Sequence, residues 1–161
     1  MPAPSGPTPP DPLPDGAPAG ETPGVARTPP PPVAAVVEFV ACINRGDLEG
    51  LVALMTEDHE LQIEGAAPLR GPGRNRAGWA GYFSAYPDYV IHPEQIAERD
   101  GTVAVLGATT GSHLGLPDGE ERALRLIWLA EVDGGRLRYW RLCDDEPHRR
   151  VELGLAAGAA G

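Results

Sequence analysis

The apolar residues between positions 33 and 55 fall at helical spacing in two consecutive stretches. The first repeats at the i, i+3, i+4, i+7 spacing of a helix with one packed face, and its apolar positions are Val33, Val36, Val37 and Val40. Gly46 can end this helix, and Asp47 can cap the next one. The sequence therefore predicts a long helix and then a short one, whose apolar positions are Leu48, Leu51, Val52 and Met55.

A strand and a third helix are predicted between residues 59 and 86. Residues 59–64 alternate around Leu61 and Ile63, as in a half-buried strand. Residues 71–73 (Gly-Pro-Gly) break the chain, and Pro87 ends the helix that follows. We expect the aromatic face of this helix to lie in the core and to line a cavity if the fold has one. That face carries Trp79, Tyr82, Phe83 and Tyr86.

After Pro87 the period of the apolar residues changes to two, which is the spacing of β-strands. Asp100-Gly101 and Asp133-Gly134-Gly135 are turn signals, and residues 115–119 are expected to form a loop. Helices followed by an antiparallel meander are an α+β pattern. The predicted strands are residues 89–98, 102–114, 122–132 and 136–144.

The predicted strand over residues 122–132 is apolar on both faces. One face carries Leu124, Leu126, Trp128 and Ala130, and the other carries Ile127 and Leu129. A strand of this kind is covered on both sides. The helices can cover one face, and a small domain has little left for the other. The pattern therefore predicts a homodimer formed through the sheet.

Composition divides the chain into a folded part and two ends. Residues 1–32 hold 13 of the 19 prolines and few aliphatic residues, a composition typical of a disordered segment. Residues 149–161 turn to alanine and glycine and are expected to form a flexible tail. The intervening residues 33–148 are long enough for one modest core.

Charge and cysteine content restrict the class of protein. The formal net charge of -10 opposes non-specific binding to nucleic acid. No stretch has the length and hydrophobicity of a membrane span, and the N-terminus lacks a secretory signal pattern. Cys42 and Cys143 each lie inside an apolar element. We therefore expect two buried free thiols and a cytoplasmic location.

Two acids, Asp144 and Asp145, stand where the last predicted strand ends. A carboxylate held at the edge of an apolar cavity has a raised pKa and can take a proton from a carbon acid. The alternative is a strand-end carboxylate that is hydrogen-bonded to a turn or paired with an arginine. Strand alternation turns Asp144 and Asp145 to opposite sides, which leaves Asp145 facing solvent; a bulge would exchange the two.

The order of these elements resembles the SnoaL-like polyketide cyclase family of the nuclear transport factor 2-like superfamily. The resemblance covers residues 33–147 and implies a cone-shaped, curved antiparallel sheet wrapped around three N-terminal helices, with a cavity inside and a dimer interface outside. The matching pieces are Asn44-Arg45-Gly46-Asp47, Leu69-Arg70-Gly71, Pro87-Asp88, Gly111-Ser112-His113-Leu114-Gly115 and Trp140-Arg141-Leu142-Cys143-Asp144.

The resemblance assigns the catalytic acid to Asp144, four residues after Trp140. The related cyclases place a histidine on the preceding strand, where this chain has Trp128. The Arg-x-Asp of limonene epoxide hydrolases is not repeated at Arg125, and the first-helix tyrosine of ketosteroid isomerases is replaced by Phe39 at the nearest aromatic position. The family's known catalytic sets are therefore incomplete in this chain.

The remaining candidates indicate a site that uses no metal or cofactor. His113 is a second candidate for proton transfer, with strand-end packing as its alternative role. No cluster has the spacing of metal ligands.

The hypothesis is a cofactor-independent lyase, isomerase or cyclase acting on a small apolar molecule; the alternative is a non-catalytic ligand-binding or dimerisation module. The expected substrate contacts are Trp79, Tyr82, Trp128, Trp140 and Glu64.

Overall fold

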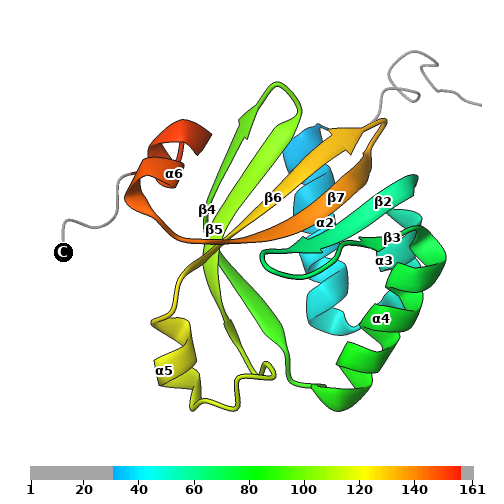
Figure 1. Cartoon of the computed structure of the whole chain (residues 1–161), viewed down its shortest axis with the longest axis horizontal. Helices are drawn as coiled ribbons and strands as arrows, with labels where there is room; N and C mark the ends of the chain where they lie inside the picture. The colour runs from blue at the N-terminus through cyan, green and yellow to red at the C-terminus, as the bar shows by residue number, and fades with distance from the viewer. Residues whose placement is uncertain (1–30, 157–161) are drawn as a thin grey trace, which may run out of the picture.

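The computed structural model describes residues 31–156, which form helices packed on a six-stranded sheet (Figure 1). The Pro-rich segment expected over residues 1–32 lies almost wholly outside the described residues. Only Pro31 and Pro32 fall inside them, and Pro32 begins the first described helix.

The first two described helices are α2, Pro32–Arg45, and α3, Leu48–Ala53. Gly46 ends α2 in the left-handed conformation, with φ 66°, and donates its N–H to the carbonyl of Ile43 at 3.1 Å. Asp47 caps α3 by accepting the N–H of Gly50 at 2.9 Å. Both predicted helix boundaries at residues 46 and 47 are therefore confirmed.

The sheet is curved and open, and its strand order is β3-β2-β7-β6-β5-β4. All neighbouring pairs are antiparallel except β2 and β7, which run parallel. The expected α+β fold with a curved sheet around the N-terminal helices is confirmed. The strands are β2 Met55–Ile63, β3 Leu69–Arg70, β4 Val90–Arg99, β5 Thr102–Thr110, β6 Leu126–Asp133 and β7 Arg136–Asp144.

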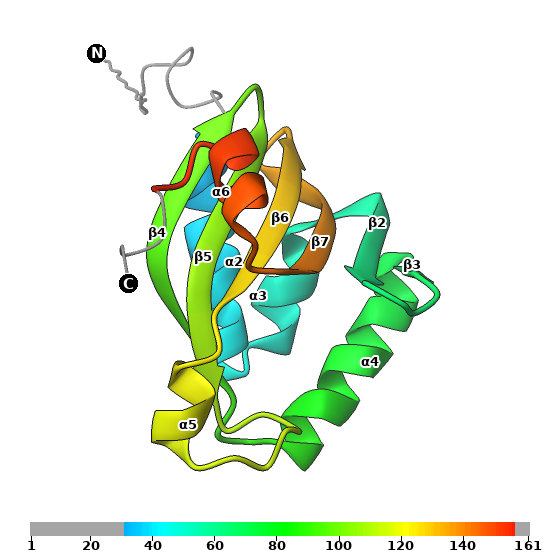
Figure 2. The same ribbon diagram turned by 60° about the vertical axis from the view of Figure 1, so that its left-hand side comes forward.

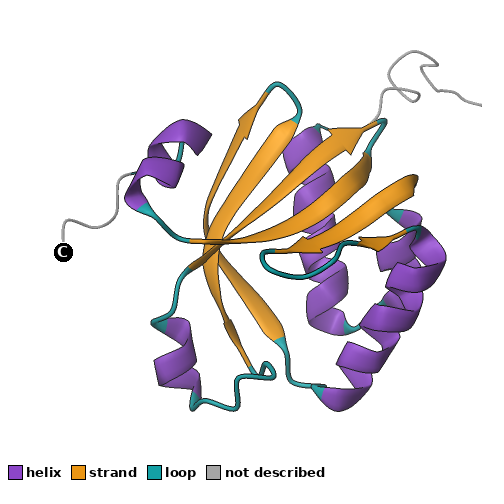
Figure 3. Ribbon diagram, in the orientation of Figure 1, coloured by secondary structure: helices purple, strands orange, loops and turns teal. Residues whose placement is uncertain are grey.

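The inner face of the sheet packs on α2 and on the third helix, α4, Pro72–Ala85 (Figures 1 and 3). Phe39 of α2 lies on Trp140 of β7, with ring centroids 5.0 Å apart. Trp140 in turn stacks on Trp128 of β6 at 6.2 Å and an interplanar angle of 16°. Burial of these rings supplies much of the apolar area that stabilises the core.

The chain after the last strand corrects the expectation of a flexible tail from residue 149. Residues Pro147–Leu153 form helix α6, which lies in front of the sheet in Figure 2, whereas α2 lies behind it. Leu155 follows it and is buried against Leu106, Ile127 and Cys143 on the outer face of the sheet. Alanine and glycine dominate the composition of this segment, but Leu155 packs on the apolar outer face of the sheet.

Helix α6 also changes the argument for a dimer. Ile127, on the second apolar face of β6, is fully buried within one chain because the C-terminal segment covers it. The dimer prediction assumed that nothing in the chain could cover this face, and for Ile127 that assumption is wrong. Leu129, on the same face, is only half-buried.

The connection between β5 and β6 also differs from the prediction. Strand β5 ends at Thr110, and Gly111 turns the chain at φ 70°. Helix α5, Asp118–Arg122, replaces the end of the expected loop and the start of the expected strand. The side chain of Glu121 holds α5 against β5 by binding Thr109, a long-range contact that periodicity cannot predict.

No helix within residues 31–156 has both the length and the apolar composition needed to cross a membrane.

Candidate functional site

An apolar cavity of about 170 Å³ lies between α4 and the inner face of the sheet. Strand β2 supplies Leu61 and Ile63 to its wall, and Leu142 of β7 lies beside them. The rest of the wall is mostly aromatic. Its ring-bearing residues are Trp79, Tyr82, Tyr89, His113, Trp128 and Trp140.

The polar side chains of this cavity wall include two that form a pair, Tyr82 and His113. The hydroxyl of Tyr82 lies 2.8 Å from Nδ1 of His113 and also accepts the backbone N–H of His113 at 3.2 Å. Helix α4 presents Tyr82 from one side, and the turn at Gly111 brings His113 from the other. A phenol and an imidazole in contact can exchange a proton with a bound molecule.

Burial adjusts the acid strength of the phenols in this region. It raises the pKa of Tyr82, an effect that the hydrogen bond from the His113 backbone partly offsets. It also raises the pKa of Tyr89, whose ring meets Tyr82 edge to face at 4.9 Å. Both phenols are therefore neutral near pH 7 and act as hydrogen-bond donors.

A carboxylate that the sequence interpretation did not single out lies behind this pair. Glu121 of α5 is only 1% exposed. It accepts a hydrogen bond from the Thr109 hydroxyl and the backbone N–H of Ser112, the latter at 3.4 Å. Burial alone would raise the pKa of Glu121, but these hydrogen bonds and the neighbouring His113 hold it below its usual value. Glu121 is therefore a buried, ionised group.

Asp144, the acid favoured by the resemblance, does not line the cavity. Its neighbour on the same strand face, Leu142, does. Asp144 instead pairs with Leu126, the first residue of β6, and is exposed in a surface depression together with Arg125. Strand alternation correctly placed Asp144 on the same face of β7 as Leu142, but the cavity extends only as far as Leu142.

Asp145 was expected to face solvent, and this expectation is wrong. It is half-buried and accepts two hydrogen bonds of 2.6 Å from Arg150 of α6. The hydrogen bonds from Arg150 lower the pKa of Asp145 against the opposing effect of burial. Asp145 therefore fastens α6 to the end of β7 and has no contact with the cavity wall.

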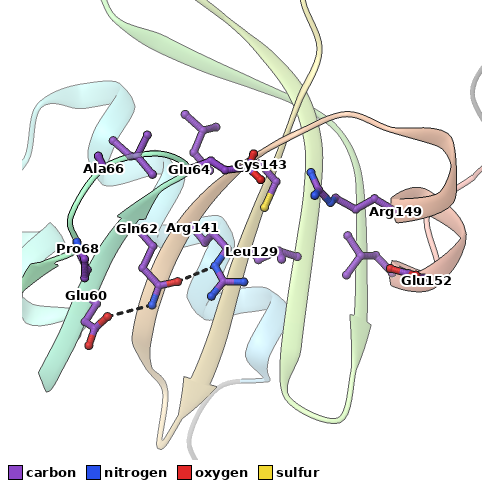
Figure 4. Close-up of a pocket in the computed structure, with 13 residues that line it drawn as sticks. Glu60, Gln62, Glu64, Ala66, Pro68, Leu129, Arg141, Cys143, Arg149 and Glu152 are labelled. Atoms are coloured by element: carbon purple, nitrogen blue, oxygen red, sulfur yellow. Dashed lines mark hydrogen bonds between the residues drawn. The ribbon is translucent and has the colours of Figure 1, made fainter.

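Glu64 lies on the outer face of the sheet, away from the other predicted contact residues. It borders a groove of about 560 Å³ together with Leu129, Cys143 and Arg149 (Figure 4). In this groove Arg141 donates a hydrogen bond to Gln62 at 2.6 Å. The structure thus brings together five sequence-predicted residues and separates two, Glu64 and Asp144. The five are Trp79, Tyr82, His113, Trp128 and Trp140.

Three buried polar side-chain atoms have no hydrogen-bond partner among residues 31–156: Nε2 of His59, Oδ1 of Asn75 and the indole nitrogen of Trp79. His59 is fully buried, and its Nδ1 bonds the carbonyl of Leu137 at 2.7 Å, which leaves Nε2 free. The indole N–H of Trp79 is also free. Burial lowers the pKa of His59 below its ordinary value, so this imidazole is neutral near pH 7.

Within the described residues, no three histidine, cysteine, aspartate or glutamate side chains are grouped as metal ligands. Cys42 and Cys143 are both buried free thiols, as expected from the sequence.

Solved structures of related shape share the fold at low sequence identity. An uncharacterized cystatin-fold protein from Novosphingobium aromaticivorans matches with a TM-score of 0.60 and 17% identity, over 69% of this chain and 96% of that one. A putative polyketide cyclase from Sinorhizobium meliloti matches with 0.58 and 18%, over 68% and 93%. An epoxide hydrolase resembling the limonene enzyme, from M. tuberculosis, matches with 0.57 and 20%, over 71% and 82%.

No curated protein matches the chain by sequence. The SnoaL-like domain family, however, matches residues 36–140, which include most of α2, helices α3 to α5, most of the cavity wall and most of the sheet described above. The chain therefore belongs to the SnoaL-like domain family.

Proposed function

We propose that this protein binds a small, mostly apolar molecule in the inner cavity and transfers a proton on it without a cofactor. The activity is that of an isomerase, cyclase or lyase. The observation that carries the proposal is the contact of 2.8 Å between Tyr82 and His113 on the wall of an aromatic cavity. Fold alone supports no single reaction, so the proposal depends on this pair.

The cavity volume supports a ligand the size of one ring. An engineered apolar cavity of about 150 Å³ takes up benzene, and the cavity here has about 170 Å³. The rings of Trp128 and Trp140 offer flat faces on its wall. A six-membered ring with one oxygen substituent matches the volume and places its oxygen near Tyr82.

The chemistry of the pair supports enolisation of a cyclic ketone. When Nδ1 of His113 carries its proton, it donates to the Tyr82 oxygen, and the Tyr82 hydroxyl is free to donate to the ketone oxygen. Nε2 of His113 then takes a proton from the carbon next to the carbonyl. The C–H electron pair forms the enolate, whose oxygen Tyr82 stabilises. His113 returns the proton to a carbon and completes the cycle.

Deuterium exchange into a simple ketone tests this proposal. Cyclohex-2-enone in D2O is followed by NMR with wild-type protein, His113→Gln and Asp144→Asn. The proposal predicts exchange that His113→Gln slows on the order of a hundredfold and that Asp144→Asn leaves unchanged. Equal exchange in wild type and His113→Gln would remove the acid-base role of His113.

A non-catalytic binding protein is the second candidate function. It is supported by the cavity wall, in which none of the described lining residues is an aspartate or glutamate. In this case cyclohex-2-enone perturbs the signals of Trp128 and Trp140 on binding, but no deuterium enters the ketone. The same NMR experiment therefore separates the two functions.

Two further parts of the proposal concern assembly and location. The groove beside Leu129 remains open on the outer face of the sheet, and a second copy of the chain could cover it. Sedimentation at micromolar concentration tests this homodimer, and a monomer would contradict it. The two free buried thiols support the reducing cytoplasm as the location.

A further inference from the structure

Glu121 is a buried charged residue to which the proposed reaction assigns no role. Its carboxylate accepts hydrogen bonds from Thr109 at the end of β5 and from Ser112 in the turn that follows. Ser112 is itself buried and directly precedes His113 in the chain. The carboxylate therefore fixes the backbone of the segment from which His113 contacts Tyr82.

Two aromatic rings and a buried carboxylate lie near His113. The rings of Tyr82 and Tyr86 of α4 approach it, with centroids at 5.8 and 6.2 Å. Glu121 of α5 is close enough for the positive form of His113 to lower the pKa of its carboxyl. The negative charge of Glu121 in turn contributes to the raised pKa values of Tyr82 and Tyr89.

The other charged residues of α5 differ from Glu121 in exposure. Asp118, Glu120 and Arg122 are exposed, and water screens their charges. His92 of β4 bonds the hydroxyl of Thr110 at 2.9 Å. Burial lowers the pKa of His92 and so does Arg122, whereas Asp118 and Glu121 raise it. Glu121 is thus the buried charge that α5 directs at the segment carrying His113.

We propose that Glu121 is the positioning residue of the Tyr82–His113 pair: its buried carboxylate fixes the turn that carries His113 and thereby holds Nδ1 of His113 against the Tyr82 hydroxyl. The inference rests on the proposed function, because a positioning residue has meaning only if His113 accepts a proton. Burial and, to a smaller extent, the negative charge of Glu121 raise the pKa of Tyr82, so the phenol remains a donor while the imidazole acts as the base.

Nitrogen-15 NMR of the His113 imidazole in wild type, Glu121→Gln and Glu120→Gln tests the inference. The two variants each remove one negative charge from the same helix, one buried and one exposed. The nitrogen shifts report which ring nitrogen carries the proton, and in wild type we expect Nδ1, which donates to Tyr82, to carry it. Glu121→Gln should lose this single-tautomer pattern, because the turn no longer holds His113 against Tyr82. Glu120→Gln should keep the pattern, and Glu121→Asp, which restores the carboxylate, should recover most of it.

The same His113 tautomer pattern in Glu121→Gln and Glu120→Gln would overturn the inference. If Glu121→Gln does not fold, the wild-type protein provides a second measurement. The backbone amide signals of Ser112 and His113 should then show an inflection at acid pH that follows the Glu121 carboxyl carbon. Absence of that inflection would also overturn the inference.

These readouts need no substrate. A His113 tautomer that depends on Glu121, in a protein that does not exchange deuterium into ketones, would refute the proposed reaction and leave the contact between Glu121 and the His113 turn intact. Exchange that depends on His113, with no response to Glu121, would refute the inference alone.

Discussion

Tyr82 of α4 and His113 of the turn after β5 lie 31 residues apart in the sequence, and their side chains meet at 2.8 Å. The contact joins the helical half of the fold to the strand meander at the wall of the cavity. Its geometry depends on Gly111, which turns the chain immediately before His113. The predictions below concern the residues that build this arrangement.

Replacement of Gly111 by alanine should destabilise the fold and displace His113. At φ 70° a Cβ atom is strained, and it would lie 2.3 Å from the carbonyl oxygen of Asp88. We expect a loss of about 3 kcal/mol or more from the strain and the clash together. Gly115→Ala is the matched control, because φ is 68° there and nothing lies within 4 Å. Urea unfolding of both variants measures the difference, and equal losses would contradict the argument.

The contact between α2 and the sheet predicts a large cost for the loss of Phe39. This ring is fully buried against Trp140, so Phe39→Ala should lower the free energy of unfolding by about 3–5 kcal/mol. Val37 lies on the same helix and is 48% exposed. Val37→Ala should therefore change stability by about 0.5 kcal/mol or less. Chemical denaturation of the two variants provides the test.

The ion pair of Arg150 with Asp145 predicts that the docking of α6 on the end of β7 depends on Arg150. Both side chains are largely buried, at 9% and 16% exposure, and removal of one partner leaves the other uncompensated. Arg150→Ala should cost about 3 kcal/mol. Arg149→Ala should cost less, because that arginine donates only to the carbonyl of Asp144. Hydrogen exchange of the α6 amides should rise in the first variant and not in the second.

The lowered pKa of Asp145 gives this pairing a pH dependence. A carboxyl whose pKa is lower in the folded state contributes stability above its unfolded pKa and loses it as pH falls through the folded value. The unfolded reference is 3.8, so docking of α6 should be intact at pH 5 and should weaken below about pH 4. Amide exchange of α6 that is independent of pH in this range would contradict the assignment.

His59 predicts a separate pH dependence at higher pH. Burial lowers its pKa below the ordinary value of 6.5, so the unfolded chain binds a proton that the folded chain does not. Stability should therefore be complete above 6.5 and fall as pH decreases from 6.5 towards 5. Thermal unfolding should show this slope in wild type and a weaker slope in His59→Phe. An unchanged slope in the variant would show that other groups cause it.

Local patterns predicted the elements well because their causes are local. The valine stripe, Gly46 and Asp47 act within one or two helical turns, and the structure confirms the two helices they predict. The aromatic face of α4 was also predicted, since its spacing is that of a helix. Periodicity therefore identified four of the aromatic side chains that line the cavity, Trp79, Tyr82, Trp128 and Trp140.

Long-range contacts explain what the sequence could not predict. Glu121 is one of several acids in residues 118–122 and resembles a solvated residue, yet its partner Thr109 is 12 residues away. Asp144 lies on the strand face expected of a cavity residue, but it pairs with Leu126 at the very start of β6 and so lies outside the cavity. The alanine and glycine content after Arg150 predicted a flexible tail. Leu155 is buried there only because the outer face of the sheet is available to it.

The most direct test of the account is the location of a bound single-ring ligand. Intermolecular NOEs from cyclohex-2-enone to the labelled protein should connect the ligand to the indoles of Trp128 and Trp140 and to the His113 imidazole. Contacts with Arg141 and Cys143 in the outer groove, or cavity contacts that persist in Leu61→Trp, whose larger side chain fills the cavity, would contradict the account.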